Sequence, residues 1–544
     1  MPTEATENVT RAEREGHAGD RHVRAGEWLV RATERLGLAG FIVYALSAPH
    51  SIAVSWMGLS AAVAAWLVRA IATRRLGLRR TPLDLPLWLF FAWTVISCLL
   101  SAEPRESIAK LVNVSTFLIF YVAQSLLTRR RAVLLAGLLI LSGSAGALWG
   151  VGELILGRGV IVRSLSVDSP LRKTTPLGEG DAVWRVNGRR VSSVDEIDEL
   201  IRQTPTGERI RLSVISRGEH VEWVGAVVTE ELRRAPSPSG IEGGGRTHSF
   251  RASGWTRHYE TFAEMLQIIA QLALGFALAV WLRRDDAERQ EHSGKSEQVR
   301  ESKSEQVRAG ARDEERRGRL RMLLPAVAFV VLAVGIALTA MRTTLLAFAV
   351  GALVVAWRAS ARGRQRAVVA SAVAAVLLLG GLVVWRTRAS GALQLKDASA
   401  DLRLEVARVA ARRILLHPLF GHGMDAVHEH WAEWGFPGKD MLHAHSTPLQ
   451  LAFDRGIPAL LFWLWLMFVF WKLTARAERM WRDTEESGAH GLALGMAGAL
   501  AGFLVSSLVN YNFGDAEVAL LVWCLMGAAV VLGREEINRD GQGE

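Results

Sequence analysis

The sequence predicts an all-α polytopic membrane protein of about 12 transmembrane helices with a small inserted α+β domain. Two observations lead to this fold class. First, half of the 544 residues are apolar, and they gather in blocks of about twenty, the length that crosses roughly 30 Å of hydrocarbon. Second, arginine clusters follow alternate blocks, as in helices that enter and leave a membrane in turn.

The apolar blocks give the predicted spans in order. The first and the eighth are short, so their boundaries are the least defined. The blocks cover residues 36–49, 51–71, 84–102, 107–127, 132–156, 261–282, 323–341, 343–357, 367–385, 458–474, 490–509 and 515–532.

Arginine placement predicts the orientation, because cytoplasmic loops accumulate Lys and Arg. Clusters at 74–80, 129–131 and 358–366 follow the second, fourth and eighth blocks, while the alternate short loops are almost free of Arg. Both termini are therefore expected in the cytoplasm. The net charge of +10 then reflects topology, and no basic, aromatic-rich soluble face indicates nucleic-acid binding. Cys98 and Cys524 fall inside predicted spans and are too few for a disulfide framework or a thiolate metal site.

Soluble segments divide the blocks into a predicted domain order. This order is a cytoplasmic tail (1–35), helices 1–5 (36–156), an outer α+β domain (157–230), a flexible linker (231–260), helices 6–9 (261–385) with a charged cytoplasmic loop (283–321), an outer polar loop (386–457), helices 10–12 (458–532) and a cytoplasmic tail (533–544).

The first outer insertion contains strand and turn signals. Asn187-Gly188 is a tight-turn dipeptide between strand-like runs, and Ser193 with Glu196 forms a capping-box pattern before a short amphipathic helix. With the Leu177–Asp181 run and Thr206-Gly207, this segment resembles a bacterial, protease-associated PDZ domain. The resemblance implies a peptide or protein partner docked on a strand edge. The alternative is a β-rich spacer without a ligand, which is supported by the position of the expected carboxylate-binding loop (157–160) directly at the membrane exit.

The second outer segment concentrates the histidines. Six of the chain's fourteen lie between Arg403 and Trp463, immediately before an apolar block. Residues 403–416 have amphipathic helical spacing, His417-Pro418 ends that helix, and a histidine pair, His443 and His445, precedes the tenth span. Ionisable groups gathered at a membrane surface indicate chemistry or a substrate path.

This histidine segment resembles the signature loop of the O-antigen ligase and polymerase superfamily, which are polytopic inner-membrane glycosyltransferases. The resemblance rests on Arg403, the HPLFGHG run at 417–423, HAHS at 443–446 and GIP at 456–458. Met341-Arg342-Thr343 resembles the arginine-bearing turn of that family, although Ser usually precedes the Arg there. The inserted PDZ-like domain is absent from most members.

The resemblance implies residue roles. Arg342 and Arg403 would bind the diphosphate of a polyprenyl-linked donor, for which a guanidinium fork is well shaped. His445 would act as general base on the acceptor hydroxyl. His443 and Arg413 would have accessory roles, and Ser446 stands where family members more often have Asn. The implied reaction inverts the anomeric carbon and uses no metal or cofactor.

The resemblance also implies substrates and location. The donor would be an undecaprenyl diphosphate-linked glycan, and the acceptor lipid A core, a growing glycan or a protein Ser/Thr, with O-antigen ligation to lipid A core favoured. The chain would span the bacterial inner membrane, in contact with membrane lipids, with its active site in the periplasm.

Other interpretations stay open from the residues alone. Arg342 could be a snorkelling anchor and Arg403 one cation of a solvated helix face. The histidines could bind zinc, although no HExxH pair or Cys cluster accompanies them. His417 and His422 are interpreted as turn or packing residues, and His428 and His430 as solvent-exposed. A lipid-linked glycan transporter or a PDZ-bearing scaffold would be the non-enzymatic functions.

Overall fold

The computed structural model describes residues 27–216, 219–248, 250–256, 258–294, 323–360, 371, 398–438 and 443–534. The predicted ninth span (367–385), apart from residue 371, lies outside the described residues. So do most of the charged loop 283–321 and most of both tails.

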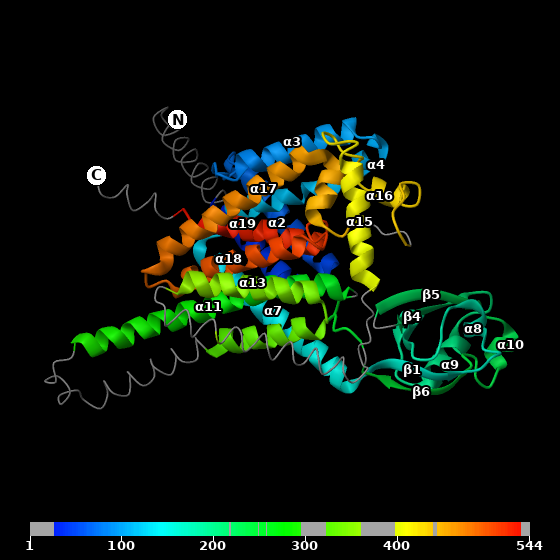
Figure 1. Cartoon of the computed structure of the whole chain (residues 1–544). Helices are drawn as coiled ribbons and strands as arrows, with labels where there is room; N and C mark the ends of the chain where they lie inside the picture. Colours follow the sequence, from blue (N-terminus) through cyan, green and yellow to red (C-terminus); the bar gives the residue numbers. More distant parts are fainter. Residues whose placement is uncertain are drawn as a thin grey trace, which may run out of the picture.

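The described part of the chain is mostly helical (Figure 1). Among the described residues, six helices are long and apolar enough to cross a membrane: α2 (Ile52–Thr73), α7 (Arg129–Leu156), α11 (Tyr259–Gly294, apolar over Tyr259–Arg284), α13 (Arg342–Ala359), α17 (Thr447–Arg482) and α18 (Ser487–Ser507). Shorter apolar helices cover α3 (Asp84–Leu100), Leu111–Leu126, Leu323–Leu338 and α19 (Ala516–Leu532), and a further helix covers residues 27–47. The chain is thus a polytopic membrane protein in its composition and helix lengths, and the number twelve stays a prediction.

The predicted span over 107–127 contains the apolar helical stretch Leu111–Leu126, but this stretch is not one regular helix. The chain there forms α4 (Pro104–Ala109), α5 (Leu111–Val114), the 3-10 turn η1 (Ser115–Phe117) and α6 (Leu118–Leu126). The Ser115 hydroxyl donates to the Val112 carbonyl at 2.6 Å, and such side-chain bonds compete with regular helix geometry. The result is a broken segment beside the outer loop.

The tenth predicted span (458–474) is preceded by a helical segment that the sequence analysis did not predict. Ser446 caps α17 by accepting from Leu449 N, so helical structure begins at Thr447. Gly456, at φ 80°, then interrupts the helix just before Pro458. The residues before Gly456 form a separate lead-in helix (447–455), and Figure 1 shows α17 bending near α15 (Ala398–Ile414).

Small residues let the central helices approach closely. α11 packs on α18 where Gly275 faces Gly491 and Gly495, and a Cβ on Gly275 would overlap Gly491 O. Such small-residue contacts are typical of helix association in membranes, where close van der Waals packing replaces the hydrophobic effect.

The insertion after α7 folds as a separate α+β domain. Its strands are β1 (Arg158–Leu165), β2 (Ala182–Val186), β3 (Arg189–Arg190), β4 (Arg209–Ser216), β5 (Glu219–Val227) and β6 (Ile241–Thr247), in the antiparallel order β5-β4-β2-β1-β6, with β3 on β2. Helices α8 (Pro170–Thr174), α9 (Val194–Gln203) and α10 (Glu230–Arg234) accompany the sheet. Asn187 and Gly188 make the expected turn with positive φ, and Ser193 caps α9. The Glu196 carboxylate accepts from Ser192 N instead of the capping residue.

The prediction of a flexible linker over 231–260 is wrong at residues 241–247, because they form β6. This strand pairs with β1, so the chain itself occupies the β1 edge on which an added peptide would lie. The glycines of β6 permit the close fit, since a Cβ on Gly244 would lie 2.6 Å from both Val160 Cγ1 and Val194 Cγ2. The PDZ-like assignment itself stays a prediction.

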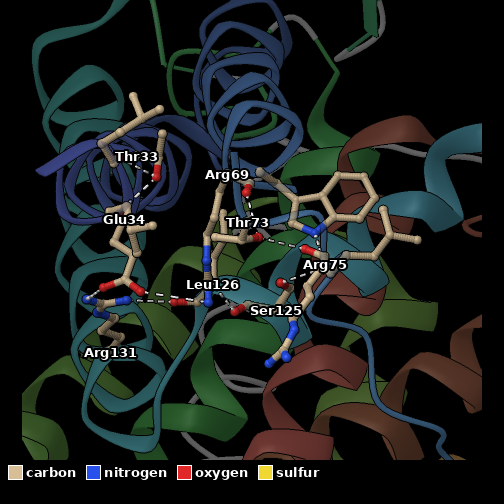
Figure 2. A network of polar contacts seen from close by, with 12 residues as sticks. Thr33, Glu34, Arg69, Thr73, Arg75, Ser125, Leu126 and Arg131 are labelled. Atoms are coloured by element: carbon tan, nitrogen blue, oxygen red, sulfur yellow. Dashed lines mark hydrogen bonds and ion pairs between the residues drawn. The ribbon is translucent and has the colours of Figure 1, made fainter. Parts of the chain in front are cut away.

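Figure 1 shows the α+β domain, α15 and α16 (Ala426–Glu429) together at one end of the helix bundle. The sequence predicts both insertions on the same side of the membrane, and in the structure they lie at the same end of the helix bundle (Figure 1). Away from that end, Glu34 lies 3.8 Å from both Arg69 and Arg131, and these arginines donate to Ser125 O and Leu126 O (Figure 2). Arg131, which belongs to one of the clusters that predict the orientation, thereby joins α7 to helix 27–47 and α6, and Arg69 adds α2 to the same group of contacts.

Candidate functional site

The predicted catalytic histidine lies in a constrained turn at the start of α17. His445 has φ 52°, a left-handed conformation that is uncommon for a residue with a side chain. Ala444 N donates to Gln450 Oε1 at 2.7 Å and His445 N to His443 Nδ1 at 3.3 Å, which fixes the turn. Strained backbone held by its surroundings is frequent at functional sites.

Burial keeps both imidazoles of this turn neutral. The ring centroids of His443 and His445 are 4.6 Å apart. Burial, with added repulsion from His443 and Arg403, lowers the pKa of His445 to about 3. Burial also lowers the pKa of His443, against an opposing effect of Glu260. Both rings are therefore unprotonated near neutral pH.

Arg403 is brought next to this pair. It lies on α15 and forms an ion pair with Glu260, the second residue of α11, at 3.7 Å. Both Arg403 and Glu260 influence the titration of His443, which places a cation and an anion beside the imidazoles.

Arg342 is connected to the same turn through Asn510. It is the first residue of α13, and its neighbour Thr343 accepts from Asn510 Nδ2 at 3.2 Å. The Asn510 carbonyl accepts from Thr447 N at 3.1 Å, two residues after His445. One asparagine thus bridges the start of the helix that carries Arg342 and the turn that carries His445.

A buried carboxylate, which the sequence analysis did not single out, organises this bridge. Glu264 of α11 is 1% exposed. Its Oε1 accepts from Ser506, from Asn510 Nδ2 at 2.9 Å and from Thr344 at 3.4 Å, and its Oε2 from Asn512 Nδ2 at 3.5 Å. Asn512 in turn accepts from Thr447 Oγ1 at 3.0 Å. We call these six residues the Glu264 network. A lone acid inside an apolar block was the signal that could have revealed it.

Arg413 does not join His445. It lies ten residues beyond Arg403, about 15 Å along a helix of 1.5 Å rise. Its guanidinium packs over Trp434 at 5.4 Å, and its carbonyl contacts His422 Nε2 at 3.0 Å. His422 itself stacks on Phe453 with ring centroids 4.6 Å apart, and burial lowers its pKa to about 4. This cluster is a packing core for the outer segment.

The prediction that His428 and His430 are solvent-exposed is wrong, because both are half-buried. His430 lies between Glu433 at 2.7 Å and Glu103 at 3.1 Å, and the hydrogen bond that its ring donates to the Glu433 carboxylate raises the pKa of His430. The sequence spacing missed this contact because Glu103 comes from the distant α3–α4 connection.

Zinc was the competing explanation of the histidines. Within the described ranges, no three His, Cys, Asp or Glu side chains come together closely enough to hold a metal ion.

The comparison with family models gives one match. The model described as O-antigen ligase matches residues 327–464. No curated protein matches the chain. The matched range contains Arg342, Arg403, His443 and His445, and it does not include the α+β domain. The predicted resemblance to the O-antigen ligase superfamily is therefore supported over this part of the chain.

Proposed function

We propose that this protein is a membrane glycosyltransferase that moves a glycan from a polyprenyl diphosphate carrier to a hydroxyl acceptor on the outer, periplasmic side of the bacterial inner membrane. The observation that carries the proposal is the neutral, half-buried His445 beside Arg403, at a turn that Asn510 connects to the helix of Arg342. The match of this region to the O-antigen ligase family supports the same reaction class.

In this proposal, His445 removes the proton from the acceptor hydroxyl while that oxygen attacks the anomeric carbon of the donor sugar. The bond from this carbon to the diphosphate oxygen breaks, and the diphosphate leaves with the electron pair. Attack opposite the leaving group inverts the anomeric carbon. Arg342 and Arg403 stabilise the charge that develops on the diphosphate, which guanidinium forks do well in a partly dry site.

Donor binding also adjusts the base. A pKa of about 3 makes the free His445 a weak base. Arg403 contributes to the low pKa, and a bound diphosphate would neutralise this cation and stabilise an imidazolium. His445 then becomes a competent base only when the donor is present, which limits unproductive proton transfer.

His443 supports the turn from inside. Its Nδ1 accepts from His445 N, which leaves its proton on Nε2 when the ring is neutral. The His443 ring packs against Tyr511 at 5.5 Å between centroids. We propose a positioning role for it.

We favour O-antigen ligation to lipid A core among the acceptors, with polymerisation of a surface glycan and transfer to protein Ser/Thr as alternatives. A transporter would be expected to place ionisable groups along a path through the membrane. Glu264, by contrast, has its carboxylate surrounded by hydrogen-bond donors of its own network. This arrangement supports a fixed structural role and favours the enzyme.

The test is glycan transfer in cells that lack their own enzyme, with lipopolysaccharide and periplasmic glycoproteins examined from the same culture. His445→Ala should abolish transfer at matched membrane abundance. His417→Ala, which removes an exposed imidazole of the same outer segment, is the control and should transfer normally. The labelled product names the acceptor. Equal activity of the intact chain and His445→Ala would reject His445 as the base, and inactivity of all chains with a matched donor would favour the scaffold. Transfer should also continue in EDTA, since the proposed reaction uses no metal.

A further inference from the structure

A further arginine lies buried outside the group formed by Arg342, Arg403 and His445. Arg455 is the last residue of the lead-in helix and is 6% exposed. Its Nε is buried without a hydrogen-bond partner, and among the described residues its guanidinium forms no hydrogen bond or ion pair. Its Cζ lies over the ring of Phe90, 5.5 Å from the ring centre. Buried charges normally have a partner, because removing them from water is costly.

Arg455 lines a cavity of about 180 Å³. Lys110 and Asn113 lie at its more exposed side, and Gln450, Asp454 and aromatic side chains of α3 and the α18–α19 connection line the rest. The space is large enough for several water-sized groups, which is far more than one ion requires.

The two carboxylates of the cavity already have partners of their own. Asp425 pairs with Lys110 at 2.7 Å, and Asp454 accepts from Gln450 Nε2 at 2.8 Å. Among the described residues that line this cavity, Arg455 therefore remains a buried cation with unused hydrogen-bonding capacity, and the buried indole Nε1 of Trp523 is a second donor without a partner. Its fork of donors is suited to an oxyanion such as phosphate.

The cavity lies beside the candidate site and beside an exposed apolar surface. Arg455 follows Thr447 by eight helical residues, about 12 Å along the lead-in helix. Gln450 connects the two places, because it also accepts from Ala444 N in the histidine turn. Next to the cavity, α4 and α5 carry the apolar side chains Ile108 and Val112, 46% and 71% exposed.

We infer that this cavity binds a phosphate oxyanion carried on a membrane lipid, with Arg455 as its ligand-binding cation. The inference rests on the proposed function for its role in transfer: the diphosphate of the donor would lie near Arg342 and Arg403, and a phosphorylated glycolipid acceptor would be held at Arg455, at the other end of the lead-in helix. The same chemistry could come from an anionic phospholipid headgroup.

Thermal unfolding of the purified full chain in detergent tests the site directly, with inorganic phosphate as the probe at constant ionic strength. Phosphate should raise the Tm of the intact chain and of Arg412→Gln, which removes an exposed arginine from the same outer segment. It should leave the Tm of Arg455→Gln unchanged, and Arg455→Lys should keep part of the effect. Without phosphate, Arg455→Gln should unfold at the same or a higher temperature, because no hydrogen bond or ion pair is lost and the cost of burying the cation is removed. A lower Tm there, or an equal phosphate response, would overturn the inference by making Arg455 structural or the effect non-specific.

Nanodiscs distinguish the two sources of the phosphate. We expect lipid A to protect the intact chain more than dephosphorylated lipid A does, with this difference lost in Arg455→Gln. A higher Tm in nanodiscs of equal parts phosphatidylglycerol and phosphatidylcholine than in nanodiscs of phosphatidylcholine alone, lost in Arg455→Gln, would identify a phospholipid site. If no lipid raises the Tm in a way that depends on Arg455, the inference is rejected. In transfer assays, Arg455→Gln should raise the acceptor KM about tenfold, the value of one charge-assisted contact. The unfolding measurements do not require glycan transfer. If phosphate raises the Tm through Arg455 in a protein that transfers no glycan, the proposed function is rejected and the inferred phosphate site is retained.

Discussion

Replacing Glu264 by leucine is the perturbation that tests whether a buried polar network positions the candidate site. The substitution has similar size and removes the acceptor for four donors, from Ser506, Asn510, Thr344 and Asn512. Hydrogen bonds between membrane helices contribute about 0.6 kcal/mol each on average, so the four together give about 2.4 kcal/mol of unfolding free energy.

The larger penalty for orphaned buried donors, about 1–3 kcal/mol each, should not apply in full. The Ser506 and Thr344 hydroxyls can turn back to carbonyls of their own helices, and Asn510 Nδ2 keeps its contact with Thr343. We therefore expect Glu264→Leu to cost about 2–3 kcal/mol. Glu264→Gln keeps the three contacts of Oε1 and should cost under about 1 kcal/mol.

The assay is reversible unfolding in mixed micelles by increasing SDS, with transfer measured on the folded fraction. Gln271→Leu is the matched control, because Gln271 lies in the same helix, is equally buried and makes a single hydrogen bond, to Phe348 O at 2.9 Å. It should cost about 0.6 kcal/mol and leave transfer unchanged. Glu264→Leu should lower kcat about 100-fold, the effect of a misplacement near 1 Å. Equal destabilisation by both leucine variants, or full transfer by Glu264→Leu, would refute the reasoning.

Four further predictions follow from single positions. Gly456→Ala should destabilise the protein by more than about 2 kcal/mol, because its φ is 80° and an added Cβ would overlap a backbone carbonyl of the preceding loop. Thermal unfolding measures this loss of stability, and a Tm equal to that of the intact chain would contradict the prediction. Arg403→Lys should change stability by less than about 0.5 kcal/mol, since its ion pair is partly exposed, yet lower transfer about tenfold by losing the guanidinium fork; equal transfer rates would exclude a bidentate role. The acid limb of kcat/KM should lie far below pH 6.5, near pH 3, and the acid limb of kcat should lie higher, because the bound diphosphate stabilises the imidazolium of His445. The folded pKa of His445 is below its unfolded value, so its contribution to stability is present above pH 6.5 and is lost as pH falls from there toward 3. Gly244→Val should expel β6 from the β1 edge, seen as faster amide exchange confined to residues 241–247 and their β1 partners, and unchanged exchange there would show that this close contact is dispensable.

The sequence predicted several elements because their signals are local. The Asn187-Gly188 turn, the Ser193 cap and the apolar helices each depend on residues within one or two turns, where propensity and periodicity act. The family resemblance likewise identified the part of the chain around His445 that the O-antigen ligase model matches.

The sequence alone determined a chain of apolar helices with two polar insertions and a histidine-rich turn before α17. Only the tertiary structure decided which polar groups meet. Glu264 is separated from Asn510 by 246 positions, and Arg455 borders a cavity formed with Lys110 from a different part of the chain. The sequence also did not predict that β6 occupies the β1 edge. Three consecutive glycines are typical of a flexible segment, and only the structure shows that a side chain at Gly244 would overlap neighbouring valines. The reason is physical: burial and partner geometry arise from packing between distant segments. These set the pKa of His445 and leave the Nε of Arg455 without a hydrogen-bond partner.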